Sequence, residues 1–303
     1  LAVLHAEMAR QNRDALLAFD AVRPAAARIA GRIRALGRVT LLGMGASHWA
    51  NRMALFAYRK AGILAAAEVV SEAMRQPPAP GGVILLTSQS GGSGEIRAWF
   101  SRFPDEQDSY GLTLNRDGFL ARTAFSLVAP VERERAFAAT RSIMVTLALH
   151  AAILDALGGG DLAAEIAALR EVWRADAPPP APPAEAVAAL SSCRALVLSS
   201  RMPAHAALEA AALTFMELAR APALAPEIGQ LLHGPMEALS PDLALVLARP
   251  AGADAAAPTR IAEAAVRLGL KPVLLDLAGG APVAGAVTVA LPVRQGLAAQ
   301  ATL

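Results

Sequence analysis

The sequence predicts an α/β protein of two tandem domains, each with a mostly parallel β-sheet between two layers of helices. Short β-rich runs alternate with helical patterns along the chain, and the same alternation starts again after a proline-rich stretch. Strands separated by helices pair in parallel, since each helix crosses back over the sheet. The expected domains are residues 1–176 and 185–303, joined by a stiff polyproline-type linker at 177–184.

The first domain is expected to start with one or two packing helices over residues 1–38. A buried apolar strand at 39–42 and a glycine turn then lead into a helix at 47–61. Short apolar runs bounded by glycine and serine turns are typical of buried strands. The remaining expected elements are strands at 83–87, 111–114 and 125–128 and a long helix at 137–157.

The second domain repeats this scheme, which indicates a duplicated unit. Pro258 stands directly before the last expected helix. It suits a helix start, because its missing N–H costs no hydrogen bond there. The expected strands are 195–199, 243–247 and 273–277, and the expected helices are 204–220 and 259–268.

Composition excludes several classes of protein. The longest apolar run, 143–157, contains Thr146, His150 and Asp155 and is shorter than the roughly 20 residues of a membrane-spanning helix. The net charge of +2 comes without runs of like charge, so no nucleic-acid partner is expected. The single Cys193 excludes an internal disulfide and a cysteine metal cage, and the five histidines are scattered. We expect a cytoplasmic protein with no metal, no cofactor and no membrane partner.

The segment TSQSGGSGE at 87–95 follows an expected buried strand and precedes a helix. Open α/β sheets bind ligands at this carboxyl end. Three serines, a glutamine and free backbone N–H groups at a helix start form an uncharged cradle for an anion such as a phosphate monoester. The segment lacks the Gly-Lys-Ser/Thr of a Walker loop. An ordinary polar turn explains the same residues equally well.

A second glycine turn, Gly43-Met44-Gly45-Ala46-Ser47, follows the first strand. His48 stands where a dinucleotide-binding fingerprint needs its third glycine, so a Rossmann site is not predicted. The turn would bring Ser47 beside the anion cradle. A tight turn without a binding role remains an alternative.

These two motifs, followed by FAATRS at 137–142 and LHGP at 232–235, resemble the sugar isomerase (SIS) family over about residues 39–291. The order of motifs is similar to that of the isomerase domain of glucosamine-6-phosphate synthase, of stand-alone aldose–ketose isomerases and of amino-sugar-phosphate deaminases. The resemblance implies two tandem SIS domains of flavodoxin-like, three-layer fold. It also implies a homodimer with a shared active site and a phosphorylated sugar or amino sugar as ligand.

The resemblance implies a role for individual residues. It makes Glu217 the general base and His233 the group that assists ring opening, the latter reaching the pocket from the neighbouring subunit. From the residues alone, Glu217 reads as a solvated helix residue and His233 as a turn residue. Gly45, Ala46 and Ala139 are implied to line the substrate. The implied phosphate contacts are Ser47, Ser88, Gln89, Ser90 and Ser93.

The chain also departs from the family pattern. Thr214 and Arg141 stand where lysine is frequent, and Ala46 replaces a threonine. The sequence ends at Leu303, about where the family begins a final helix and a tail that carries a lysine, so no Schiff base is assigned. An N-terminal cysteine nucleophile is absent, and no glutaminase activity is expected.

The expected function is therefore that of a phosphosugar isomerase in carbohydrate metabolism. It would interconvert the aldose and ketose forms of a hexose or hexosamine 6-phosphate, with or without release of ammonia. Two alternatives stay open: a non-catalytic phosphosugar sensor and a fructosamine-phosphate deglycase. No helix-turn-helix precedes residue 39, which disfavours a regulator.

Overall fold

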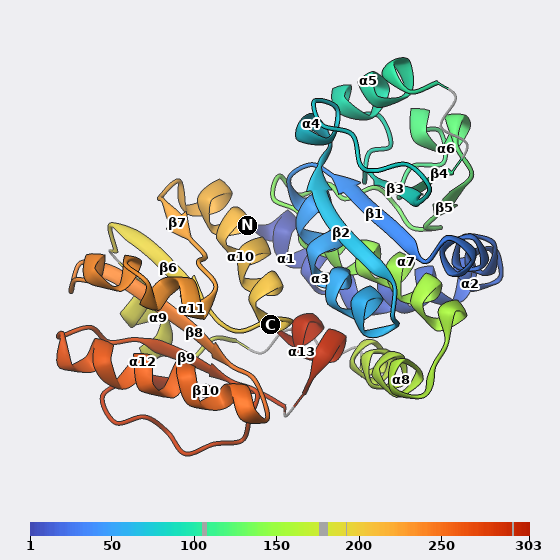
Figure 1. Ribbon diagram of the computed structural model, residues 1–303. Helices are drawn as coiled ribbons and strands as arrows, with labels where there is room; N and C mark the ends of the chain where they lie inside the picture. Colours follow the sequence, from blue (N-terminus) through green and yellow to red (C-terminus); the bar gives the residue numbers. More distant parts are fainter. Residues whose placement is uncertain (105–107, 176–180, 192, 293) are drawn as a thin grey trace. The chain divides into compact units, whose positions relative to one another are not determined.

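Two parallel sheets of five strands form the framework of the chain (Figure 1). The computed structural model describes residues 1–104, 108–175, 181–191, 193–292 and 294–303. The chain divides into two compact units, Leu1–Pro178 and Pro179–Leu303. Residues 177–180 of the predicted linker lie outside the described residues, and the linker stays a prediction.

The first sheet has the strand order β2-β1-β3-β4-β5, and all its neighbouring strands are parallel. The sequence correctly predicts its strands except β2, an alanine-rich edge strand. Its strands are β1 (Arg38–Gly43), β2 (Leu64–Val69), β3 (Val83–Thr87), β4 (Ser109–Thr113) and β5 (Ser126–Val128).

The second sheet has the order β10-β9-β8-β6-β7, again entirely parallel. Counted from the first strand of each unit, both sheets run 2-1-3-4-5, which is the flavodoxin-like order. The sequence analysis missed the two edge strands β7 and β10. The strands are β6 (Ala195–Ser199), β7 (Ala223–Leu224), β8 (Leu243–Arg249), β9 (Val273–Asp276) and β10 (Val287–Ala290).

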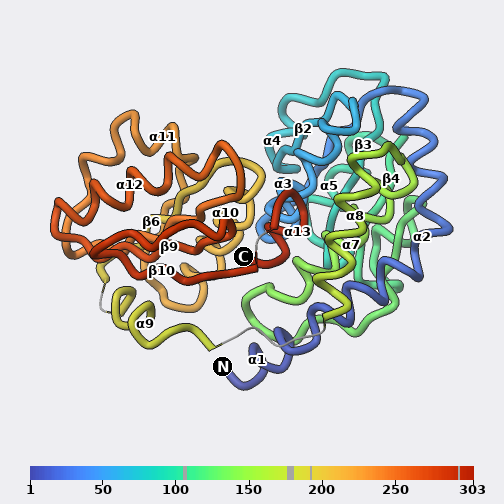
Figure 2. Tube along the Cα trace, turned by 90° about the horizontal axis from the view of Figure 1, so that it is seen from below, coloured from blue at the N-terminus to red at the C-terminus, as the bar shows by residue number. Residues whose placement is uncertain are grey.

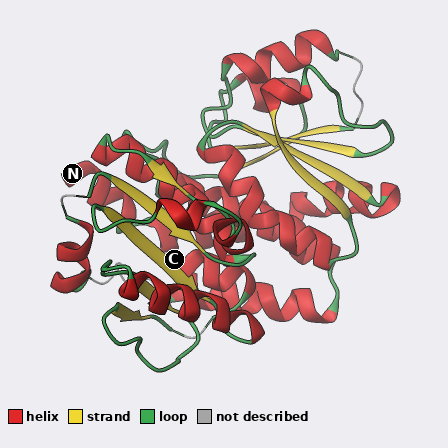
Figure 3. Ribbon diagram, turned by 60° about the vertical axis from the view of Figure 1, so that its left-hand side comes forward, coloured by secondary structure: helices red, strands yellow, loops and turns green. Residues whose placement is uncertain are grey.

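Helices cover both faces of the first sheet (Figures 1 and 3). One face carries α3 (Ala46–Lys60), which packs on α7 (Arg141–Leu157), and α7 packs in turn on α2 (Gln11–Leu36). On the other face, Leu42, Ile84 and Leu86 pack beneath Ile96 and Trp99 of α5. The helices of that face are α4 (Val70–Ala73), α5 (Gly94–Arg102) and α6 (Phe119–Thr123), and the first unit also contains α1 (Ala2–Met8) and α8 (Gly160–Arg174).

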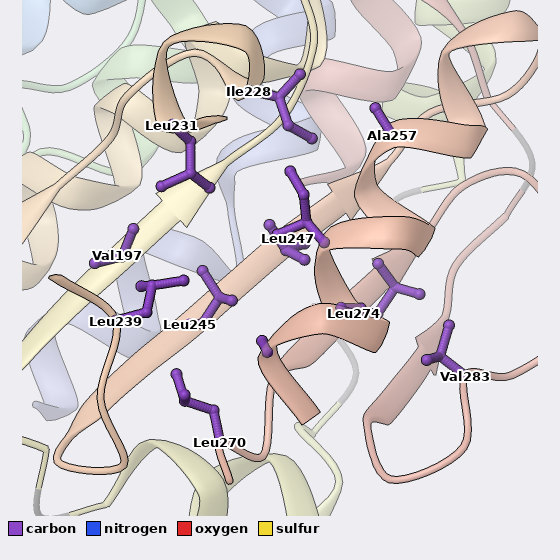
Figure 4. Packing of buried hydrophobic residues seen from close by; sticks show 13 residues of the cluster. Val197, Ile228, Leu231, Leu239, Leu245, Leu247, Ala257, Leu270, Leu274 and Val283 are labelled. Carbon is purple, nitrogen blue, oxygen red and sulfur yellow. The ribbon is translucent and has the colours of Figure 1, made fainter. Parts of the chain in front are cut away.

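In the second unit, α12 (Ala256–Arg267) and α9 (Ala184–Leu190) lie on opposite faces of the sheet (Figure 2). Leu245, Leu247 and Leu274 of the central strands pack against residues of α11 and α12 (Figure 4). Leu198 and Val246 face the other way, toward α10. This unit also contains α10 (Ala204–Ala219), α11 (Ile228–Leu232), α13 (Gly296–Thr302) and the 3-10 turns η1 (Pro235–Ala238) and η2 (Ala253–Ala255).

Two predicted helix starts are wrong. α7 begins at Arg141, four residues after the predicted start, where the carboxylate of Glu134 accepts hydrogen bonds from the first backbone N–H groups of the helix. α12 begins at Ala256, so Pro258 lies inside its first turn and not before it. Along the described part of the chain, none of the helices is both long enough and apolar enough to cross a membrane.

Candidate functional site

A cavity of about 190 Å³ opens at the carboxyl ends of β1 and β3. These strands are neighbours, but the chain leaves β1 toward β2 on one side and β3 toward β4 on the other. Such a change of direction separates the following loops and forms the usual ligand crevice of an open α/β sheet. The cavity is lined by Met44, Ser47, Thr87, Ser88, Gln89, Ser90, Ser93 and Ile96. It therefore brings together all five side chains predicted to contact phosphate.

The loop after β3 turns its carbonyl oxygens toward protein donors. The carbonyl of Ser88 accepts from the N–H of Gly91 at 3.0 Å, and that of Gln89 accepts from the N–H of Leu114 at 3.2 Å. The carbonyl of Ser90 accepts from the side-chain amide of Asn115 at 2.9 Å. Because these oxygens are engaged, hydroxyls and N–H groups remain to meet an anion in the cavity.

Gly91 lets this loop close against the neighbouring strand. Its φ is +66°, a value that side-chain-bearing residues rarely adopt. A Cβ there would lie 2.8 Å from Oγ1 of Thr113. Glycine is thus required at this point of the cradle.

The cavity is polar but uncharged. None of the described residues that line it has an ionisable side chain. Ser93 is the N-cap of α5, and its hydroxyl accepts from the N–H of Ile96 at 3.4 Å. The positive end of this helix therefore lies at the cavity, where it favours an anion.

The turn after β1 supplies Ser47 from the first turn of α3. Gly45 is the N-cap of α3 and has a φ of +51°. A Cβ on Gly43 would lie 2.9 Å from the backbone N of His48, so the turn needs glycine here too. Gly45 and Ala46, predicted to line the substrate, shape this turn but are not among the residues that line the cavity.

A second cavity of about 160 Å³ shares Gln89 and Ser90 with the first, so the two adjoin. Ala139, which is predicted to line the substrate, is among the residues of this cavity. Phe137 lies at this cavity and is 86% exposed. The lining residues are Gln89, Ser90, Leu114, Arg133, Glu134, Ala136, Phe137, Ala139 and Ser142.

Glu134 is the main residue of this region that the sequence analysis missed. Its carboxylate accepts from the backbone N–H groups of Thr140 at 3.0 Å, Arg141 at 2.9 Å and Ser142 at 3.2 Å. It also accepts from the hydroxyls of Thr140 and Ser142. Glu134 thus caps α7 from six residues before Thr140, a spacing outside the usual capping patterns.

Arg141, which takes the place of a frequent lysine, does not line either cavity. Its side chain is fully buried and donates to Glu7, to Asp14 at 3.0 Å and to the carbonyl of Glu132 at 2.8 Å. Arg141 therefore ties the N-terminal helices to the start of α7.

The two predicted catalytic residues lie in the second unit. Glu217 is half-buried near the end of α10, and burial raises the pKa of its carboxyl above the usual value. His233 is exposed and ends α11. Both cavities described above are lined by residues of the first unit, so the roles of Glu217 and His233 stay predictions.

Comparison with known proteins gives a result for the fold. No family model matches the sequence, and no curated protein does. Among solved structures, the C-terminal domain of glucosamine-fructose-6-phosphate aminotransferase from Francisella tularensis is similar, with a TM-score of 0.81 at 15% identity over 98% of this chain and 90% of that one. Tagatose-6-phosphate ketose/aldose isomerase from Escherichia coli is also similar, with a TM-score of 0.78 at 18% identity over 98% of this chain and 90% of that one.

Glucosamine-6-phosphate deaminase from Thermotoga maritima gives a TM-score of 0.65 at 17% identity, over 95% of this chain and 92% of that one. These identities are low, so the likeness concerns the fold. The chain has the fold of the sugar isomerase proteins, as its motifs predict.

Proposed function

We propose that this protein is a phosphosugar aldose–ketose isomerase that acts on a hexose or hexosamine 6-phosphate. The observation that carries the proposal is the uncharged cavity between β1 and β3. It presents four serine hydroxyls, the amide of Gln89 and the N-terminus of α5 to an anion. Ser47, Ser88, Gln89, Ser90 and Ser93 would hold the phosphate.

The adjoining cavity would take the sugar. It starts at Gln89 and Ser90, so a ligand whose phosphate lies in the cradle can extend into it. Its lining combines the small Ala139 and the polar Ser142 with the ionisable Arg133 and Glu134, a set of donors and acceptors that can meet the hydroxyls of a polyol chain. A hexose 6-phosphate has this division into an anionic and a neutral end.

Isomerisation needs a group that moves one proton between C2 and C1. We assign this role to Glu217, which would take the C2 proton of the open-chain aldose and return it to C1, through an enediolate, while a second proton passes from the C2 hydroxyl to O1. A raised carboxyl pKa brings a base closer to the operating pH, which favours this transfer. The position of Glu217 on a regular helix would also hold it in a defined place.

Ring opening needs a proton shuttle between the ring oxygen and the anomeric hydroxyl. We assign it to His233, since imidazole can give and take a proton near neutral pH. Its exposed position, beside the 48% exposed Leu232, suits a residue that enters the pocket of a partner subunit. The proposal therefore includes a homodimer with a shared active site.

The proposal also covers the organisation of the chain. The common 2-1-3-4-5 order of the two sheets supports two tandem SIS domains. We further propose a cytoplasmic enzyme, which could release ammonia from a hexosamine substrate when water hydrolyses the C2 imine that the same proton transfer forms.

The test is solvent-deuterium exchange into C1 and C2 across a panel of hexose, hexosamine and fructosamine phosphates, with ammonia and amine release recorded. The wild-type protein should incorporate deuterium and form the isomer. Glu217→Gln should lower kcat about 100-fold or more with little change in ligand affinity. Glu263→Gln, on the exposed side of α12, is the matched control and should leave kcat unchanged. Absence of both deuterium incorporation and isomer formation with every substrate would refute the isomerase.

A non-catalytic phosphosugar sensor is the second candidate, and Thr214 favours it. This residue stands one turn before Glu217, where the family often has lysine, and its hydroxyl donates to the carbonyl of Ala210 at 3.2 Å. It brings no positive charge to the base. A sensor would bind a phosphosugar tightly, without any exchange, and Glu217→Gln would change nothing measurable.

A further inference from the structure

Four buried polar side chains form a continuous hydrogen-bond network that ends at the phosphate cradle. The hydroxyl of Tyr58 lies 3.2 Å from Nδ1 of His150, and Nε2 of His150 lies 2.9 Å from Oδ1 of Asn51. The hydroxyl of Thr87 donates to the same Oδ1 at 2.7 Å. Tyr58, His150 and Asn51 are 0% exposed and Thr87 is 2% exposed.

The direction of each hydrogen bond in this network follows from its acceptor. Oδ1 of Asn51 can only accept, so both Thr87 and Nε2 of His150 donate to it. Nδ1 of His150 then carries no proton and accepts from Tyr58. Burial lowers the pKa of His150 to about 3, which keeps the imidazole neutral at neutral pH. All four side chains of this network are therefore uncharged, as are the side chains of the cradle next to it.

Asn51 connects the two segments that build the cradle. Thr87 is the last residue of β3, lines the cavity and directly precedes Ser88. Asn51 lies on α3, four residues after Ser47 and so on the same side of that helix. The bond from Thr87 to Asn51 thus fixes the strand that delivers Ser88 and Ser90 against the helix that delivers Ser47.

The role of Thr87 in this arrangement is positional. Its hydroxyl proton is already directed to Asn51, so it is not available to a ligand in the cavity. The oxygen of Asn51 makes the contacts here: Oδ1 accepts from Thr87 and His150, whereas Nδ2 is buried without a hydrogen-bond partner among the described residues. Loss of Oδ1 would leave two buried donors, the hydroxyl of Thr87 and Nε2–H of His150, without an acceptor, so the role of Asn51 in the site has to be measured as ligand affinity and not as stability.

We propose that Asn51 is a positioning residue for the phosphate cradle, which sets the spacing between Ser47 and Ser88 through Thr87 without touching the ligand. The inference rests on the proposed function, since it assumes that the cradle binds a phosphorylated sugar. It assigns the buried hydrogen-bond network a role in ligand affinity, in addition to its contribution to the core.

The test is a double-mutant cycle on the affinity for the phosphosugar that the panel identifies, with glucose 6-phosphate as the first probe. Asn51→Leu and Thr87→Val should each raise Kd about tenfold, and the double variant should be no weaker than the poorer single variant. Thr87→Ser keeps the hydroxyl and should stay within about twofold of wild type. KM should rise in parallel with Kd while kcat changes little.

Thr40→Val is the control for a general loss of packing. Thr40 is a buried threonine in the middle of β1, 5% exposed and away from the cavity. This variant should leave Kd unchanged even if Tm shifts. If Asn51→Leu does not fold, the pair Thr87→Val and Thr87→Ser decides the question.

Two results would overturn the inference while the proposed function stands: unchanged Kd in Thr87→Val and Asn51→Leu despite a lower Tm, or strictly additive effects of the two changes. A wild-type protein that binds no phosphosugar at all would instead refute the proposed function, and this inference with it. Binding by wild type is measured first, so the two failures are distinguishable.

Discussion

The side-chain amide of Asn115 donates a 2.9 Å hydrogen bond to the carbonyl oxygen of Ser90, from the loop after β4 to the loop after β3. The Oδ1 atom of the same side chain accepts from the N–H of Asp117 at 3.1 Å, which closes its own loop. Asn115 thus stabilises its own loop and fixes the carbonyl of Ser90 in the loop after β3.

Replacement of Asn115 by aspartate separates these two functions. The carboxylate keeps the acceptor for Asp117 but loses the donor to Ser90, whose carbonyl is then free to turn toward the cavity, and its negative charge adds repulsion toward a bound phosphate. We expect phosphosugar affinity to fall about threefold to tenfold with a small change in Tm. Isothermal titration of the wild type and Asn115→Asp measures this. Equal affinities would show that the loop does not depend on Asn115.

Glu134→Ala should destabilise the first unit. The variant leaves three backbone N–H groups at the start of α7 without their acceptor, at a cost of about 2 kcal/mol or more in the free energy of unfolding. Glu132→Gln is the control: its side chain is 77% exposed and pairs with Arg10, and exposed pairs contribute about 0–1 kcal/mol. Denaturant unfolding of both variants compares them. A Glu134→Ala protein as stable as Glu132→Gln would contradict the capping role.

Glu7 should make stability depend on pH. Burial alone would raise the pKa of Glu7, but hydrogen bonds from the backbone of Arg135 and from the side chains of Arg141 and Arg10 lower it below 4.5. Because the folded-state pKa lies below the unfolded one, the stabilisation is present above about pH 4.5 and is lost as the pH falls through the lowered folded-state value.

The measurement is the free energy of unfolding from pH 3 to 7 for wild type and Glu7→Gln. Above the ordinary carboxyl pKa, the variant should be less stable by about 3 kcal/mol, because it leaves the buried Arg141 short of a partner. The two curves should approach each other toward low pH. A constant gap over the whole range would show that the charge of Glu7 is not responsible.

Phosphosugar affinity should follow the ionisation of the ligand and not that of the cradle, which has no ionisable lining residue. A phosphate monoester gains its second charge with a pKa of about 6. Affinity should therefore rise from about pH 5 to pH 7 and then level off. Titrations at a series of pH values test this. Binding that strengthens on acidification would indicate a cationic group at the phosphate.

The sequence allowed the loops that line the first cavity to be predicted, for reasons that particular segments show. The strands β1 and β3 are short apolar runs that end in glycine and serine turns, so both their type and the location of the cradle follow from local pattern. The edge strands β2 and β7 are missed, because an alanine-rich run and a two-residue strand carry little β signal.

The supporting interactions could not be predicted in the same way. Asn51 meets Thr87 from 36 positions away and His150 from 99 positions away. Glu134 reaches the start of α7 across a loop, and Arg141 turns to Glu7 near the N-terminus. The contacts of Asn51 and Arg141 join elements that are far apart in the sequence. The Glu134 cap lies only six to eight residues from its partners, but its spacing is outside the usual capping patterns.

The central claim is that the cavity between β1 and β3 binds a phosphate monoester, and a crystal structure with bound glucose 6-phosphate or a glucosamine analogue tests it most directly. The account predicts the phosphate among Ser47, Ser88, Ser90 and Ser93, near the N-terminus of α5, with the sugar extending toward Ala139. A phosphate group bound elsewhere, with this cavity empty at saturating ligand, would contradict it.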